Sequence, residues 1–264
     1  LVNEDAQSLV FDDTNLFQWS KYSGYDRFEG GLRMNYGAQY TANFDRGGMI
    51  NALVGQSRQL QGRNSYATPD AANTGLSSGL DTRNSDIVTR LAVAPSSTYA
   101  FIAKARFDPT SFAMRRLDLA ASARFDSFDA TLQYARYDAQ PQIGFDRRRE
   151  GLGTSVRYRF DPNYFATGNV TFDLSRHLYN NVPPVPGTAN LFSIAALGFG
   201  LGYADDCTTV SLNYSSVYLD RSAGQPARNQ TLMLSLQLRT LGETRAQTSL
   251  GEARYLDGLS YNLR

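Results

Sequence analysis

The sequence predicts an all-β fold, an antiparallel transmembrane β-barrel segment of about eleven strands that forms part of a larger barrel. Three observations predict it: apolar and polar residues alternate over long runs, these runs have ten to sixteen residues, and short connections alternate with longer ones. Strands of soluble proteins average about five or six residues, whereas a tilted strand crosses a bilayer with about 9–11 residues. Run length therefore favours a membrane barrel over the alternative, a soluble all-β protein.

Residues 32–44 show the alternation most clearly. Their even positions, from Leu32 to Phe44, are apolar or aromatic, and their odd positions, from Arg33 to Asn43, are polar or glycine. A helix would bury positions three and four apart and mix the two classes. The same period predicts strands at about residues 29–44, 49–60, 84–94, 98–107, 112–125, 128–138, 149–160, 164–178, 191–203, 207–220 and 229–239.

The strand at 191–203 departs from the simple pattern. Its apolar residues switch from even positions such as Ile194 to odd positions such as Phe199 and Leu201. A β-bulge near Ala196 would explain the switch, because one extra residue reverses the facing of all that follow. A wrong strand boundary would explain it equally well.

The connections between these strands alternate in length. The short ones are turns rich in Gly, Pro, Asp and Asn, at residues 45–48, 95–97, 126–127, 161–163 and 204–206. The others are longer except for 108–111, and they lie at 61–83, 139–148, 179–190 and 221–228. Short turns on one side and longer loops on the other are typical of outer-membrane barrels, whose short turns face the periplasm.

The pattern divides the chain into three parts. Residues 1–28 are a loop-like, extracellular lead-in, residues 29–239 carry the barrel strands, and residues 240–264 form a C-terminal tail. Bacterial barrels have an even number of strands, and a bilayer does not tolerate open sheet edges. We therefore expect further strands from an upstream part of a longer protein.

Composition and motifs exclude several function classes. With 26 basic and 25 acidic residues the net charge is +1, which argues against a nucleic-acid partner. We find no phosphate-binding loop and no cluster of metal ligands, so we expect no cofactor, no metal and no enzyme activity. An outer-membrane hydrolase remains an alternative, with Ser175 and His177 as its candidates, although no Gly-x-Ser-x-Gly motif is present.

Several segments resemble the C-terminal barrel region of the LptD family, which assembles lipopolysaccharide in the Gram-negative outer membrane. Leu16-Phe17 matches the family, with Lys21 where the family usually has Arg. The most specific match is the motif Ser23, Gly24, Tyr25, Asp26 and Arg27. Further matches are Tyr134–Asp138 leading to Phe145–Gly151, Asp206-Cys207, and Arg228–Thr231 leading to Leu238–Gly242.

The resemblance implies a function and a set of partners. The chain would be an integral protein of the cell outer membrane, in the translocon that inserts lipopolysaccharide into the outer leaflet. Its partners would be lipopolysaccharide, the plug lipoprotein LptE, a periplasmic jellyroll and first barrel strands supplied upstream, the periplasmic lipopolysaccharide bridge and membrane lipid. A generic porin or receptor barrel is the alternative.

The resemblance also implies a lateral exit between the first and last strands of the barrel, through which lipid leaves sideways. The last strand would be 229–239, with an apolar face toward lipid and a polar face toward sugars. The exit residues would be Leu232, Leu234, Ser235, Leu236, Gln237 and Leu238.

Two further sets of residues are candidates. The family pairs cysteines at the periplasmic rim with cysteines of the jellyroll, which implies a disulfide for Cys207; Thr208 stands where a second cysteine often lies, and an inert thiol is the alternative. Arginines on the polar strand faces either bind the phosphates of lipopolysaccharide bidentately or line an ordinary polar lumen, with Asp118 and Asp173 as possible ion-pair partners. These arginines are Arg33, Arg90, Arg106, Arg116, Arg124, Arg157 and Arg159.

Overall fold

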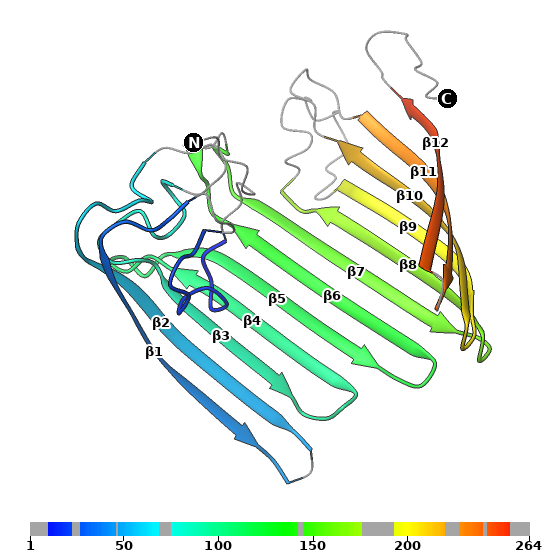
Figure 1. Ribbon diagram of the computed structural model, residues 1–264, viewed down its shortest axis with the longest axis horizontal. Helices are drawn as coiled ribbons and strands as arrows, with labels where there is room; N and C mark the ends of the chain where they lie inside the picture. The colour runs from blue at the N-terminus through cyan, green and yellow to red at the C-terminus, as the bar shows by residue number, and fades with distance from the viewer. Residues whose placement is uncertain are drawn as a thin grey trace, which may run out of the picture. The chain divides into compact units, whose positions relative to one another are not determined.

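The computed structural model describes residues 10–22, 27–45, 47–68, 75–141, 145–175, 193–219, 227–239 and 242–253. These residues form one antiparallel sheet of twelve strands, in which each strand is bonded to its neighbours in sequence (Figure 1). Among them, no helix is long and apolar enough to span a membrane. The predicted all-β antiparallel fold is confirmed. The strands are β1 Leu32–Asn43, β2 Met49–Gln61, β3 Ile87–Ala94, β4 Tyr99–Phe107, β5 Met114–Arg124, β6 Phe128–Tyr137, β7 Arg149–Arg159, β8 Tyr164–Asp173, β9 Ser193–Ala204, β10 Thr208–Leu219, β11 Ala227–Leu238 and β12 Gly242–Ala253.

All eleven predicted strands are present, with boundaries that differ by a few residues. The largest difference is at the strand predicted for 164–178, which ends at Asp173. Ser175 explains the early end, because its hydroxyl donates to the Asp173 carboxylate at 3.2 Å and accepts the Glu150 N–H at 3.0 Å. A side chain that bonds the local backbone in this way competes with the strand ladder.

The alternation of short and long connections is confirmed. Short connections join β1 to β2, β3 to β4, β5 to β6, β7 to β8, β9 to β10 and β11 to β12. Aspartates stabilise some of the connections by accepting backbone N–H groups two or three residues on. Asp205, for example, accepts the N–H groups of Cys207 at 2.9 Å and Thr208 at 2.7 Å.

The strand β12 lies in the range that the sequence analysis assigns to a tail. Its residues pair with β11 from Arg228↔Ala253 to Leu238↔Gly242. Neither of its faces is apolar, since Thr244, Ala246 and Thr248 alternate with charged or polar residues, so hydrophobic alternation did not reveal it. Because β11 is bonded to both β10 and β12, its predicted position as the last strand is wrong.

The bulge predicted near Ala196 is confirmed. Thr171 of β8 pairs with Ala196, whereas the next residue, Phe172, pairs with Ile194, so Ala195 is an extra residue in β9. Beyond it, Phe199 and Leu201 are exposed while Gly198 and Gly200 are buried. The extra residue thus accounts for the change of parity in the sequence.

The chain forms two compact units, the first made of residues 1–121 and 135–149 and the second of residues 122–134 and 150–264. In the second unit, Leu201, Leu212 and Leu234 are neighbours across β9, β10 and β11. Their exposed fractions are 59%, 47% and 48%. The opposite face is polar and close-packed: a Cβ on Gly200 would lie 2.2 Å from Asn213 Oδ1. One face is therefore apolar and exposed, as period two predicts.

In the first unit, loops cover the polar face of the strands. The segment 10–22, dark blue in Figure 1, crosses this face and contains no helix or strand. Gly37 and Gly55 are paired neighbours, and a Cβ on them would lie 3.2 Å from Phe17 and 2.3 Å from Leu16. Because these two glycines have no side chain, the segment 10–22 can pack closely against the strands at this point. The buried core that results consists of Phe11, Leu16, Leu53, Tyr66, Leu80 and Val88.

Leu234→Arg tests the facing of the strands. Because the sequence predicts that the exposed apolar face contacts lipid, we expect this change to cost about 2–4 kcal/mol of unfolding free energy near the bilayer midplane. Gln237→Arg, on the other face of β11, is the matched control and should change stability little. Denaturant titration of the full-length protein in lipid measures both, and equal losses would contradict the assigned register.

Candidate functional site

The segment 10–22 is fastened to the polar face of β3 and β4 by an ion cluster. Asp13 Oδ2 accepts a hydrogen bond from Arg90 Nη1 at 2.8 Å, and Asp13 Oδ1 lies 2.8 Å from Lys104 Nζ. Asp12 Oδ2 accepts from the same Lys104 Nζ at 3.3 Å. The Asp13 side chain is only 1% exposed, so these ion pairs are shielded from solvent on one side.

Strand register explains why a carboxylate is needed here. Arg90 and Lys104 are direct partners in the β3–β4 ladder, and like charges directly opposite one another destabilise a sheet. Asp13 lies between them and cancels the repulsion. Asn51 Oδ1 accepts from Arg90 Nε at 3.2 Å and from Nη2 at 2.6 Å, which leaves Nη1 directed at Asp13.

A second anchor lies where the segment joins β1. Glu29 forms ion pairs with Lys21 at 3.5 Å and with Arg33 at 3.2 Å. Arg33 also donates to Asn64 at 3.0 Å and lies 5.4 Å from the centroid of the Tyr66 ring. Burial lowers the pKa of Lys21, and the Glu29 carboxylate opposes this shift. The predicted candidate Arg33 therefore binds the loops of its own chain.

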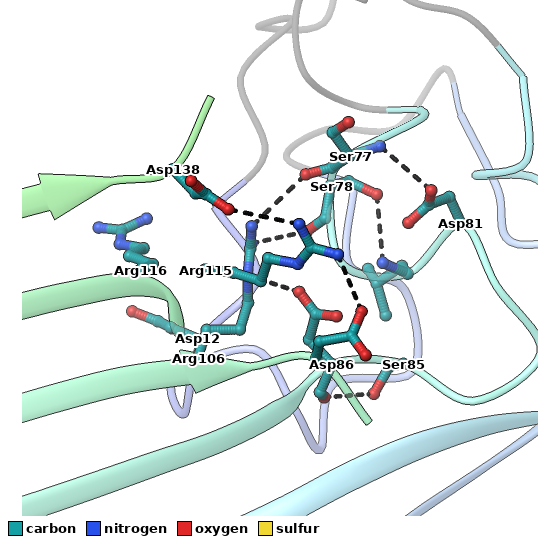
Figure 2. A network of polar contacts seen from close by, with 12 residues as sticks. Asp12, Ser77, Ser78, Asp81, Ser85, Asp86, Arg106, Arg115, Arg116 and Asp138 are labelled. Atoms are coloured by element: carbon teal, nitrogen blue, oxygen red, sulfur yellow. Dashed lines mark hydrogen bonds and ion pairs between the residues drawn. The ribbon is translucent and has the colours of Figure 1, made fainter. Parts of the chain in front are cut away.

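Arg106, another predicted candidate, holds the loop that precedes β3 (Figure 2). Its Nε lies 2.9 Å from Asp86 Oδ2, and its Nη1 donates to the Ser78 carbonyl at 2.7 Å. Nη2 donates to the Ser77 carbonyl at 3.4 Å. Since Arg106 is only 7% exposed, it serves as a buried anchor for this loop.

A cavity of about 520 Å³ opens beside this anchor. Arg115 bridges two carboxylates at its rim. It lies 2.9 Å from Asp108 and 3.3 Å from Asp138, a contact drawn in Figure 2. Backbone N–H groups of Ser111 and Thr110, together with Arg115, hold the pKa of Asp108 well below its usual range. Arg106 and Arg115 pair with three aspartates of the lining, so most of the charges at the cavity are already paired.

Three of the four remaining predicted arginines each contact a carboxylate or an aromatic ring. Arg116 forms an ion pair with Asp118 and lies 4.7 Å from the centroid of the Tyr137 ring. In the second unit, Arg124 pairs with Asp129 at 3.1 Å, Arg157 lies 3.9 Å from the centroid of the Phe165 ring, and Arg159 is exposed. Six of the seven arginines thus contact a carboxylate or ring of the protein, which favours a structural role for most of them.

Cys207 lies in the short turn between β9 and β10, where it is exposed and free. A small cavity adjoins it, lined by Asp206, Gln237 and Arg239 among others. Arg239 Nη1 donates to the Asp206 carbonyl at 3.2 Å. The cysteine is therefore accessible from outside the sheet, and its disulfide stays a prediction.

Other predicted residues lie partly outside the described part of the chain. Ser23, Gly24, Tyr25, Asp26 and His177 fall there. Arg27 is described and lies 5.7 Å from the centroid of the Tyr22 ring. The predicted exit residues lie on β11, with Ser235 opposite Ser211 and Arg245. Within the described ranges, no group of three or more His, Cys, Asp or Glu is placed to hold a metal ion.

Sequence reasoning missed the residues that build the ion cluster. None of Asp12, Asp13, Asn51 and Lys104 is among the site residues predicted from the sequence. One signal was present: the chain has only two lysines, Lys21 and Lys104, and both belong to the anchors of the segment. Charge pattern alone does not show which loop folds back over which strands.

Comparison with known proteins gives one family. The family model described as LptD, LPS transport system D, matches residues 1–172. A search of curated proteins gives no match. The matched range contains the whole ion cluster, the Arg106 anchor and nearly all of the strands β1 to β8.

Asp86 predicts a specific pH dependence. Burial raises its pKa to about 6, although Arg106 and Arg115 oppose the shift. Because the folded pKa lies above the unfolded value of about 3.9, Asp86 stabilises the fold fully below pH 4, and this contribution is lost as the pH rises through 6. Thermal melting of the full-length protein should show that Asp86→Asn removes this fall in stability between pH 4 and 6. Parallel curves for the two proteins would contradict the assignment.

Proposed function

The chain belongs to the LptD family of LPS transport proteins, and from this premise we propose that it forms part of the outer-membrane translocon that inserts lipopolysaccharide into the outer leaflet. The family match over residues 1–172 carries the proposal. The long antiparallel strands support it, because closed β-barrels are one of the two structures that satisfy their backbone hydrogen bonds inside a membrane. A porin or a hydrolase has no comparable support.

The chain contributes barrel wall in the cell outer membrane. Two features support this placement: the row of exposed leucines across β9, β10 and β11, and the polar opposite face with its glycines. An apolar outer band and a polar interior are what lipid and lumen require. In this orientation the short turns, including the one with Cys207, face the periplasm.

The lateral exit lies beyond β12 rather than at β11. A bulky lipid leaves a closed barrel only through a seam whose backbone ladder opens, and β11 is laddered on both edges. Among the described strands, β1 and β12 are each bonded on one edge only, and β1 is the strand that we expect to pair with the strands supplied upstream. Its other edge adjoins the seam, and the apolar face of β11 lies one strand away from it.

The partners follow from the family. The barrel surrounds the plug lipoprotein LptE and receives lipopolysaccharide from the periplasmic bridge through the upstream jellyroll. Cys207 forms a disulfide with a jellyroll cysteine, which its exposure in a short turn supports. The oxidising periplasm favours such a bond.

Engineered disulfides test the position of the seam. In cells depleted of their own LptD, the full-length wild-type protein should restore lipopolysaccharide at the surface. A disulfide from Ala246→Cys to a cysteine on the strand beside the free edge of β12 should abolish this, because it locks the seam. Surface labelling of lipopolysaccharide measures the result.

The matched control is the pair Ser235→Cys and Arg245→Cys, which are direct neighbours in the β11–β12 ladder. This disulfide should leave transport intact, since that ladder is part of the wall. If only the control disulfide stopped transport, the seam would lie at β11. If the wild-type protein failed to restore surface lipopolysaccharide, the proposed function itself would be refuted.

Cys207→Ser tests the interdomain bond. Non-reducing electrophoresis of full-length protein from membranes should show a mobility shift that reductant abolishes and that the variant lacks. The exposed Ser127→Ala in another short turn serves as the control and should keep the shift. If wild-type protein migrates identically with and without reductant, Cys207 is a plain thiol.

A further inference from the structure

Arg90 of β3 and Lys104 of β4 have the properties of an anion-binding site. The anion that fills this site is an aspartate of the same chain. Two cations face each other in register, and the only anions bonded to them in the described residues come from the loop segment, through Asp13 and Asp12. A carboxylate that bridges a guanidinium and an ammonium at 2.8 Å occupies the position that an oxygen of another anion would take. We infer that Arg90 and Lys104 form a binding site for phosphate monoesters, which Asp13 keeps filled.

The site is built independently of its occupant. Asn51 accepts two hydrogen bonds from Arg90, so the guanidinium keeps its orientation when Asp13 leaves. Asn51 itself donates to Thr41 Oγ1 at 2.6 Å on the neighbouring strand β1. The polar support of Arg90 therefore lies on strands, and only the anion lies on a loop.

Phosphate fits the two cations better than a single carboxylate does. Arg90 Nη1, which Asn51 leaves free, would donate to one phosphate oxygen, and lysine adds a compact point charge beside it. Arg90 and Lys104 together carry two positive charges, which matches the charge of a phosphate monoester near neutral pH. Asp13 alone supplies one negative charge, and Asp12 completes the second from 3.3 Å.

Displacing Asp13 from the site costs free energy, because the segment 10–22 must leave the strands with it. Releasing the segment exposes Phe11 and Leu16, which are fully buried, and the exposure of large apolar side chains to water is unfavourable. Dilute free phosphate does not overcome this in the native protein. A phosphate delivered at high local concentration on a lipid that passes the polar face is the fitting source, and this part of the inference rests on the proposed function.

The change Asp13→Asn removes the negative charge that fills the site, and this allows the site to be tested. In full-length Asp13→Asn, we expect a lower melting temperature than wild type in chloride, because two facing cations lose their anion. Inorganic phosphate at equal ionic strength should restore it, and a concentration about 100 times the dissociation constant shifts the unfolding equilibrium about 100-fold toward the folded state. Wild-type protein should melt alike in both salts.

Controls separate this site from a general salt effect. Phosphate should not rescue the double variant Asp13→Asn, Arg90→Gln, and it should not affect Asp161→Asn, which changes an exposed turn aspartate. If Asp13→Asn does not fold in chloride, its refolding yield in phosphate replaces the melting temperature. Equal effects on all variants, or no recovery of Asp13→Asn, would overturn the inference.

Two further additions distinguish whether the phosphate comes from a lipid or from solution. Stabilisation of Asp13→Asn by detergent-dispersed lipopolysaccharide, but not by its dephosphorylated form, supports the site and identifies the lipid as a source. Stabilisation by inorganic phosphate alone supports the site with free phosphate as its ligand. Because melting does not depend on transport, a failed transport assay would refute the proposed function and leave this result standing.

Discussion

The first unit depends on one buried carboxylate. The ladder between β3 and β4 forces Arg90 and Lys104 to face each other, and Asp13 makes that arrangement stable. Through Asp13 the segment 10–22 is held on the polar face, and with it Phe11 and Leu16 complete the core. Breaking a buried ion pair costs about 3–5 kcal/mol, which is a large share of the stability of an ordinary domain.

Alternation of apolar and polar residues was enough to predict eleven strands, and even the bulge in β9. It failed for β12, where Thr244, Ala246 and Thr248 give too little contrast between the faces. A strand of this kind is defined by the backbone ladder to its neighbour, which no property of its own side chains reveals. The consequence was a misplaced last strand.

The site was less predictable than the fold because its contacts join distant segments. Arg33, Arg90 and Arg106 were found as polar-face arginines, but their partners Glu29, Asp13 and Asp86 lie in loops. Strand periodicity places a side chain on a face and says nothing about which loop returns to cover it. The glycine pair at 37 and 55 makes that return possible, and a glycine in a strand signals a close approach without naming the approaching group.

The bulge at Ala195 also constrains how β9 can change in length. Before Ala195 the apolar residues lie at even positions, and after it they lie at odd positions. Deleting Ala195, the extra residue itself, would give a regular ladder and leave Ile194, Phe199 and Leu201 on one face. At any other position of β9, an insertion or deletion keeps the facing of the residues beyond it only when it involves an even number of residues.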